Sequence, residues 1–264
     1  MYNVVTWDHK PPSHFRAAAQ DNIGARYDTI RFKAATIVSV VKNEDGTFEV
    51  VDEEDNKYQG KRLALATGVT DLLPDITGFK ELWGKLIFHC LFFHDFEERG
   101  AVSAGVLAAG FLTQPAMILH MARMATPLAK KVTVYCHGNE ELTSQVLKEF
   151  EGKPLSFEPR RVTAVKKLGE RVTVHFEDGE TREEGFLVSV PPVKINGPFH
   201  KQLGLDVDPM GFIKTNPPFN ETSVSGVFAV GDCASMVKAT TQAIAMGSFG
   251  AAGLVAQLAS MGKF

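Results

Sequence analysis

The sequence predicts an α/β protein in which two domains are interleaved along the chain. Two observations lead to this class. The middle of the 264-residue chain has the pattern strand, helix, strand, which is typical of a βαβ unit. Segments before and after that unit alternate β-branched or aromatic residues with turn residues, which is typical of antiparallel strand meanders. A chain of this length is sufficient for one large or two small folded units.

The first elements are a short helix and a three-stranded antiparallel meander. The helix is expected over residues 13–24, where apolar residues recur four apart after a Pro-Pro pair. The meander is expected over residues 27–68, in which three apolar, β-branched stretches are separated by 42–46 and 54–60. Gly46 follows an aspartate in the first of these turns, and glycine tolerates the positive φ that a tight hairpin requires.

A second group of elements follows a loop rich in Pro and Gly at residues 69–84. The expected elements are, in order, a strand at 104–110, a helix over 117–128, a strand at 132–135, a helix over 142–150 and a strand meander from 162 to 190. The chain then ends with a strand and loop in 226–235 and a helix full of Ala and Gly over 240–260. A helix with so many small residues is expected to have a close neighbour.

Composition excludes several classes of protein and partner. Hydrophobic residues at 44% and charged residues at 22% indicate a globular chain rather than a disordered one. The net charge is −3 and no run of Lys or Arg exceeds two, so neither nucleic acid nor a membrane surface is an expected partner. Cys90, Cys136 and Cys233 are far apart, which argues against disulfides and CxxC zinc sites and favours the cytoplasm. The apolar stretch 101–112 is too short to span a bilayer.

Three stretches resemble the thioredoxin-reductase-like FAD/NAD(P)-binding family, which has the pyridine nucleotide-disulfide oxidoreductase fold. They are ALATGVTDLLPDITGF, FHCLFFHDFEERG and GVFAVGDCAS, in that order. Within the family, the fungal gliotoxin-type dithiol oxidases resemble the chain most. The resemblance implies two Rossmann-type domains: a degenerate FAD-type domain from residues 1–80 and 201–264, and a degenerate NAD(P)-type domain from 81–200. It also implies a homodimer.

The chain departs from the family pattern at three places. It contains no GxGxxG, so we expect an N-terminally truncated protein that lacks the first FAD-type βαβ unit. The family's CxxC motif is reduced to Cys90, because Phe93 stands at the position of the second cysteine, and intramolecular dithiol exchange needs that cysteine. The nicotinamide turn has only Gly110, preceded by Ala108 and Ala109, so NADPH binding is not expected.

The resemblance also implies site residues. Gly231, Asp232, Gln242 and Ala243 stand where relatives hold the flavin, and FAD is the cofactor if one is bound. Asp232 has a second interpretation as the N-cap of a helix near residues 235–238. His94 stands where the dithiol oxidases place a His that acts as base, although it can also form a surface pair with the aspartate that follows it.

Because the three departures occur together, we expect a redox-neutral enzyme that binds no cofactor. The leading hypothesis is cyclisation or isomerisation of an apolar secondary metabolite, including a pericyclic reaction of Diels–Alder type, with His94 or Lys238 donating a hydrogen bond and Asp232 orienting the substrate or acting as base. The alternative is an FAD-dependent thioredoxin-reductase-like oxidoreductase of secondary metabolism. A third hypothesis is a non-catalytic partner of an intact paralogue.

Overall fold

A computed structural model describes residues 1–262, with the side chains of His94 and Asp95 outside the described part. The chain forms two compact units. One consists of Met1–Thr70 and Val193–Phe264, and the other of Asp71–Pro192. The domain boundaries expected at residues 80 and 200 thus stand about ten residues later than the division in the structure. The difference arises because Ile76, Phe79 and Leu82 are buried in a hydrophobic core of the second unit.

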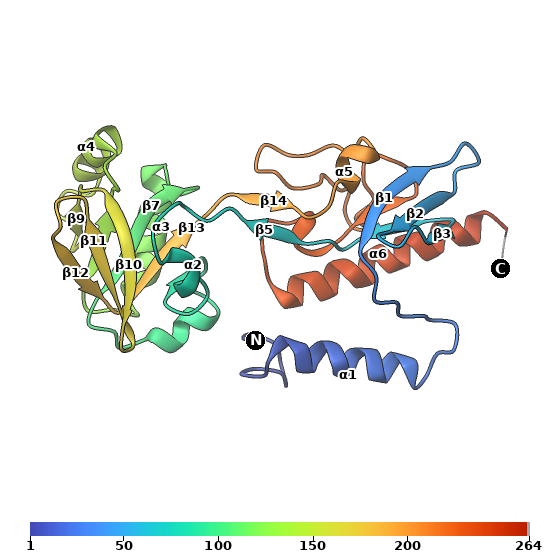
Figure 1. The fold of residues 1–264 in the computed structure, drawn as a ribbon, viewed down its shortest axis with the longest axis horizontal. Coiled ribbons are helices and arrows are strands. Elements are labelled where there is room, and N and C mark those ends of the chain that lie inside the picture. Colours follow the sequence, from blue (N-terminus) through green and yellow to red (C-terminus); the bar gives the residue numbers. More distant parts are fainter. Residues whose placement is uncertain (263–264) are drawn as a thin grey trace. The chain divides into compact units, whose positions relative to one another are not determined.

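The second unit is built on a five-stranded sheet in which neighbouring strands pair in parallel. Its order is β6 (Ile87–Phe88), β13 (Phe186–Val190), β7 (Ala104–Gly110), β8 (Val132–Tyr135) and β9 (Ser156–Glu158). Helices α3 (Pro115–Ala125) and α4 (Glu140–Glu149) connect β7 to β8 and β8 to β9 (Figure 1). The predicted βαβ unit is therefore confirmed. Ile118, Ala122 and Ala125 of α3 are fully buried, whereas Met117 is exposed.

The strand meander of this unit is shorter than expected. β10 (Val162–Leu168), β11 (Arg171–Phe176) and β12 (Thr181–Glu184) form a three-stranded antiparallel sheet. The stretch 181–190 does not continue as one strand, because the chain leaves the meander at Gly185 and β13 joins the parallel sheet. A Cβ at Gly185 would lie 2.8 Å from the Ser103 carbonyl oxygen, so the crossing strand passes directly against its neighbour. Short helix α2 (Phe79–Leu82) and 3₁₀ helix η1 (His94–Glu98) complete the unit.

The first unit contains the expected N-terminal meander, with one strand in a different place. β1 (Ile37–Lys42), β2 (Phe48–Asp52) and β3 (Lys57–Gly60) pair antiparallel, and Gly46 has a φ of +80° in the first turn. The third strand comes early because the Asp52 carboxylate accepts hydrogen bonds from the backbone N–H groups of Glu54 and Asn56, which closes a tight turn. The following apolar stretch forms β4 (Leu63–Leu65), which pairs in parallel with β15 (Val227–Ala229).

Further elements of this unit surround its hydrophobic core. β5 (Val69–Asp71) pairs with β14 (Val193–Ile195), where the chain crosses between the units, and α5 (Phe199–Gln202) and 3₁₀ helix η2 (Gly231–Cys233) follow. Helix α1 spans Pro12–Gly24, close to the predicted bounds. Its expected apolar face is only half-buried, and no α1 residue is fully buried.

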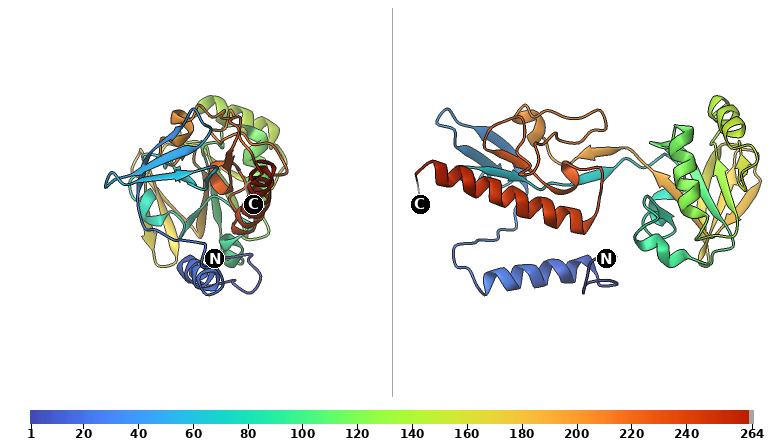
Figure 2. Two further views of the ribbon diagram at one scale, coloured as in Figure 1. Left: turned by 90° about the vertical axis from the view of Figure 1, so that its right-hand side faces the viewer. Right: turned by 180° about the vertical axis from the view of Figure 1, so that it is seen from behind.

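Helix α6 (Thr240–Ser260) matches the predicted C-terminal helix at both ends. Its small residues do have the close neighbour that the sequence predicts. A Cβ at Gly253 would lie 2.6 Å from Cβ of Phe219, and one at Gly250 would lie 2.9 Å from the Val230 side chain. The right view of Figure 2 shows the helix running along the rest of its unit.

The opposite face of α6 is open. The helix carries no charged residue, and Ile244, Phe249 and Val255 are each about half exposed. Among the described residues, α6 is the one helix long and apolar enough to cross a membrane by length and composition, which the sequence analysis did not identify. The Gly250–Gly253 face of α6 packs against its own unit, and 17% of the apolar window is buried.

Candidate functional site

The candidate site lies in the first unit, between the end of β15 and the start of α6. The chain leaves β15, turns through Gly231 with a φ of +72°, and forms the 3₁₀ turn that carries Asp232. A Cβ at Gly231 would lie 3.7 Å from Cβ of Ala243, so this turn comes close to the first turn of α6. Cys233 is buried behind it, and its thiol faces the carbonyl oxygens of Leu65 and Val230 at 3.5 and 3.3 Å.

A pocket of about 290 Å³ opens at this point. It is lined by Met1, Pro12, Phe15, Arg16, Asp232, Lys238, Ala239, Thr240 and Ala243. The structure therefore brings together three of the residues selected from the sequence, namely Asp232, Lys238 and Ala243. One carboxylate and two cationic side chains line a space whose remaining walls are mostly apolar. This is the usual composition of a small-molecule site.

The amino end of α6 contributes a second polar feature to the pocket. Ala239 is the N-cap residue and has no side chain that can accept a hydrogen bond, and the first turn contains no acidic residue. The first N–H groups of a helix lack partners within the helix, and they add to the positive end of its dipole. An oxygen atom or an anionic group of a ligand is therefore stabilised beside Thr240. Residues 235–239 form no helix, so the interpretation of Asp232 as a helix cap is wrong.

The other residues selected from the sequence lie elsewhere. Gln242 is exposed on the first turn of α6 and does not line the pocket. His94 begins η1 in the second unit, and its side chain lies outside the described residues, so its expected role as donor stays a prediction. Phe15 and Arg16 of α1 were missed. The Pro-Pro pair places both residues in the first turns of a helix, but it does not indicate what their side chains face.

The thiol chemistry of the second unit rests on one residue. Cys90 follows β6 and is half-buried, whereas Cys136 and Cys233 are buried. Burial raises the pKa of both buried thiols, which keeps them protonated and unreactive. Phe93, at the position of the family's second cysteine, packs edge-on against Phe92 with ring centroids 5.7 Å apart. The two-thiol exchange expected of a CxxC motif therefore has no second sulfur there.

The turn after β7 does not offer a cradle for a dinucleotide. Gly110 has a φ of +64°, and a Cβ there would lie 2.6 Å from the Val190 carbonyl oxygen. The close backbone of the neighbouring strand is therefore sufficient to explain why a residue without a side chain is needed at this position, and no ligand has to be invoked. Ala108 and Ala109 precede it, and both carry the Cβ that a close pyrophosphate approach excludes. The residues present at this turn do not fit NADPH.

For FAD the residues present fit one part of the cofactor. The Asp232 carboxylate and the uncapped amino end of α6 suit a polyhydroxy chain and an electron-accepting ring edge. The Gly-rich turn that receives a pyrophosphate in Rossmann-type domains is not in the sequence, which contains no GxG at all. A pocket of about 290 Å³ also stands at the lower limit of ordinary ligand sites. The described site therefore matches the flavin end of FAD and not its pyrophosphate.

Comparison with known proteins identifies the family. The pyridine nucleotide-disulphide oxidoreductase family matches residues 4–247. Thioredoxin reductase aclD of Aspergillus oryzae is 40% identical over 98% of this chain and 84% of its own length, and thioredoxin reductase sirT of Leptosphaeria maculans is 38% identical over 94% and 78%.

Solved structures agree with the sequence matches. An oxidoreductase from Agrobacterium tumefaciens superposes with a TM-score of 0.85 at 27% identity, covering 97% of this chain and 83% of that one. Putative thioredoxin reductase TrxB of Bacillus anthracis superposes with a TM-score of 0.87 at 21% identity, covering 98% and 85%, and shows the shared fold. The chain belongs to the pyridine nucleotide-disulphide oxidoreductase family and has the thioredoxin-reductase-like fold.

Proposed function

We propose that this chain is a flavin-dependent oxidoreductase of fungal secondary metabolism that acts on a small apolar molecule. The protein does so without a redox dithiol of its own. The observation that carries the proposal is the pocket at the start of α6, where Asp232 and Lys238 meet the uncapped helix end. The similarity to the aclD and sirT reductases supports the same chemistry. It changes the order of the two hypotheses drawn from the sequence, because the oxidoreductase replaces the redox-neutral enzyme as the leading one.

The flavin, when bound, supplies the redox chemistry, and the chain's own residues bind and orient. Asp232 accepts hydrogen bonds from hydroxyl groups beside the turn at Gly231. The N–H groups of the first turn of α6 stabilise negative charge that develops near Thr240. Lys238 adds a positive charge on the same side of the pocket. Cys90 holds one thiol only, so the chain cannot pass electrons to its substrate through an internal disulfide.

The redox-neutral hypothesis remains the second candidate, favoured by the sequence's lack of any GxG and by the Ala108–Ala109 turn. Under this hypothesis, the same pocket holds an apolar metabolite in a reactive conformer. Asp232 orients the substrate and Lys238 donates a hydrogen bond to an oxygen that becomes negative during cyclisation or isomerisation. Such positioning alone accelerates reactions substantially.

Titration with FAD separates the two candidates. The purified chain is mixed with excess FAD, passed through gel filtration and examined for a retained visible flavin band. We expect a band for the wild type and about ten-fold weaker binding for Asp232→Asn, because a hydrogen bond to a charged group is lost. Asp28→Asn, at an exposed position of the same unit, is the control and should bind as the wild type does. A folded, colourless wild-type protein contradicts the flavin proposal and leaves the redox-neutral one.

Two further properties are proposed with the function. We place the protein in the cytoplasm, because three cysteines that form no disulfide suit a reducing compartment. We also propose a homodimer, which the family resemblance implies, and which sedimentation analysis tests directly. Co-purification with an intact paralogue is the outcome expected if the chain is instead a non-catalytic partner.

A further inference from the structure

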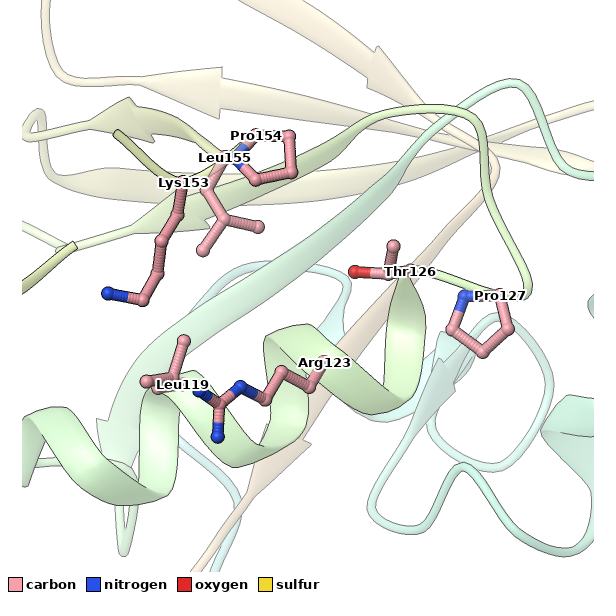
Figure 3. Close-up of a pocket in the computed structure, with 7 residues that line it drawn as sticks. All are labelled: Leu119, Arg123, Thr126, Pro127, Lys153, Pro154 and Leu155. Carbon is pink, nitrogen blue, oxygen red and sulfur yellow. The ribbon is translucent and has the colours of Figure 1, made fainter. Parts of the chain in front are cut away.

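A second pocket, of about 450 Å³, lies wholly within the second unit and plays no part in the proposed function. Its walls come from two places in the chain. Leu119, Arg123 and Thr126 belong to α3 and its carboxyl end, with Pro127 directly after them. Lys153, Pro154 and Leu155 form the connection between α4 and β9 (Figure 3).

The pocket is near the amino ends of the parallel strands, whereas nucleotides bind at the carboxyl ends of the strands in such folds. Helix α3 begins just after the carboxyl end of β7 and ends before the start of β8. Its carboxyl end is therefore near the amino ends of the strands, and Leu155 directly precedes the first residue of β9. Ligands of open α/β sheets usually bind at the carboxyl ends of the strands. This second pocket is thus separate from the turn at Gly110.

The lining combines an apolar surface with two cations. Leu119, Pro127, Pro154 and Leu155 provide the apolar surface. In the view of Figure 3 the ammonium group of Lys153 and the guanidinium of Arg123 are on the same side of the pocket, and Pro127 is on the other. No carboxylate side chain lines the space. In a protein of net charge −3, a pocket with two cations and no acid selects for an anion.

The two cations keep hydrogen-bonding capacity for a ligand. Within the described residues, the Arg123 guanidinium forms no hydrogen bond or ion pair, so its donors are available. Nζ of Lys153 donates one hydrogen bond to the Glu149 carbonyl oxygen at 2.8 Å and lies 5.5 Å from the centre of the Phe150 ring. These contacts hold the lysine at the pocket while leaving two of its three N–H donors unused.

From this arrangement we propose that the second pocket binds a small apolar molecule that carries one carboxylate. The carboxylate pairs with Arg123 and Lys153, since a guanidinium matches the two oxygens of a carboxylate in a fork-like geometry. The hydrocarbon part covers Leu119, Leu155 and the two prolines. A medium-chain fatty acid or an arylalkanoic acid has this chemistry.

Binding of decanoate to the full chain tests the proposal, with decanamide as the uncharged counterpart. Ligand-observed NMR or calorimetry should give a dissociation constant on the order of 1 mM or tighter for decanoate. The amide should bind at least three-fold more weakly. Arg123→Gln and Lys153→Gln should each weaken decanoate binding by roughly three- to ten-fold, and should leave the amide unchanged.

The control variant is Lys148→Gln, which removes an exposed lysine of α4 that does not line the pocket. It should bind decanoate as the wild type does. Leu155→Ala tests the apolar wall and should weaken acid and amide alike. The proposal is overturned by equal affinity for acid and amide, by wild-type binding in both charge variants, or by no binding at 5 mM decanoate. None of these results depends on whether flavin binds to the other unit.

Discussion

Two glycines of α6 should respond in opposite ways to the same substitution. In the middle of a helix, Gly→Ala normally stabilises by about 1 kcal/mol, because alanine loses less backbone entropy on folding. At Gly247 the added Cβ meets nothing within 4 Å, so the full gain is expected. At Gly253 the same Cβ would lie 2.6 Å from Cβ of Phe219 and 3.0 Å from Cε1 of Phe228. Forced overpacking of this kind costs about 1–3 kcal/mol.

The expected difference between Gly247→Ala and Gly253→Ala is therefore about 1–3 kcal/mol in the free energy of unfolding. Urea denaturation followed by circular dichroism at 222 nm measures it. Because α6 dominates the helical signal of its unit, the transition of that unit is the one to compare. If Gly253→Ala is as stable as Gly247→Ala, α6 does not pack against Phe219 as the structure shows, and the position of the pocket at its amino end would need revision.

Three other predictions concern single groups. The hydroxyl of Tyr58 donates a hydrogen bond to the Asp52 carboxylate at 2.7 Å, and this bond is the main cause that lowers the pKa of Asp52 to about 2. The ionised carboxylate therefore stabilises the fold above about pH 4, and this stabilisation is lost as the pH falls toward 2. Tyr58→Phe should raise the pKa of Asp52 in an NMR titration. Asn139 caps α4 by accepting a hydrogen bond from the N–H of Leu142 at 2.9 Å, and Asn139→Ala should cost about 1 kcal/mol in urea denaturation. Ellman's reagent should modify one thiol per folded chain, and Cys90→Ser should abolish that reaction; two or more reactive thiols would contradict the burial of the others.

The elements with regular periodicity could be predicted from the sequence, whereas the places where the chain changes sheets could not. Helix α6 and strand β7 match their predicted bounds because each follows one hydrophobic pattern from end to end. The sequence assigns strand β4 to the meander, but in the structure it pairs with β15, which lies 164 positions further along the chain. Its composition suits either partner. Pairing over such a distance is decided by tertiary packing, which local patterns do not contain.

The candidate site could be predicted only in part from the sequence. The turn at Gly231 and Asp232 could be found because the stretch GVFAVGDCAS resembles the corresponding stretch of the thioredoxin-reductase-like family. Phe15 and Arg16 could not be assigned to the same pocket, since nothing in a helix far earlier in the chain indicates what its exposed side chains will face. The second pocket was missed for the same reason, because Arg123 and Lys153 meet only through the packing of α3 beside the α4–β9 connection.

The retained fold and the altered motifs are compatible because they depend on different residues. The buried residues of β7 and β8 hold the parallel sheet through their side chains, and they contribute nothing to a redox reaction. Phe93 and Ala109 stand beside the ends of strands, where substitution changes chemistry with little effect on the core. Identity of 40% to a reductase therefore supports the fold of both units strongly and the thiol step only weakly. The proposed flavin site is at the turn of Gly231 and the altered thiol motif is in the region after Cys90, so flavin binding and thiol reactivity must be measured separately.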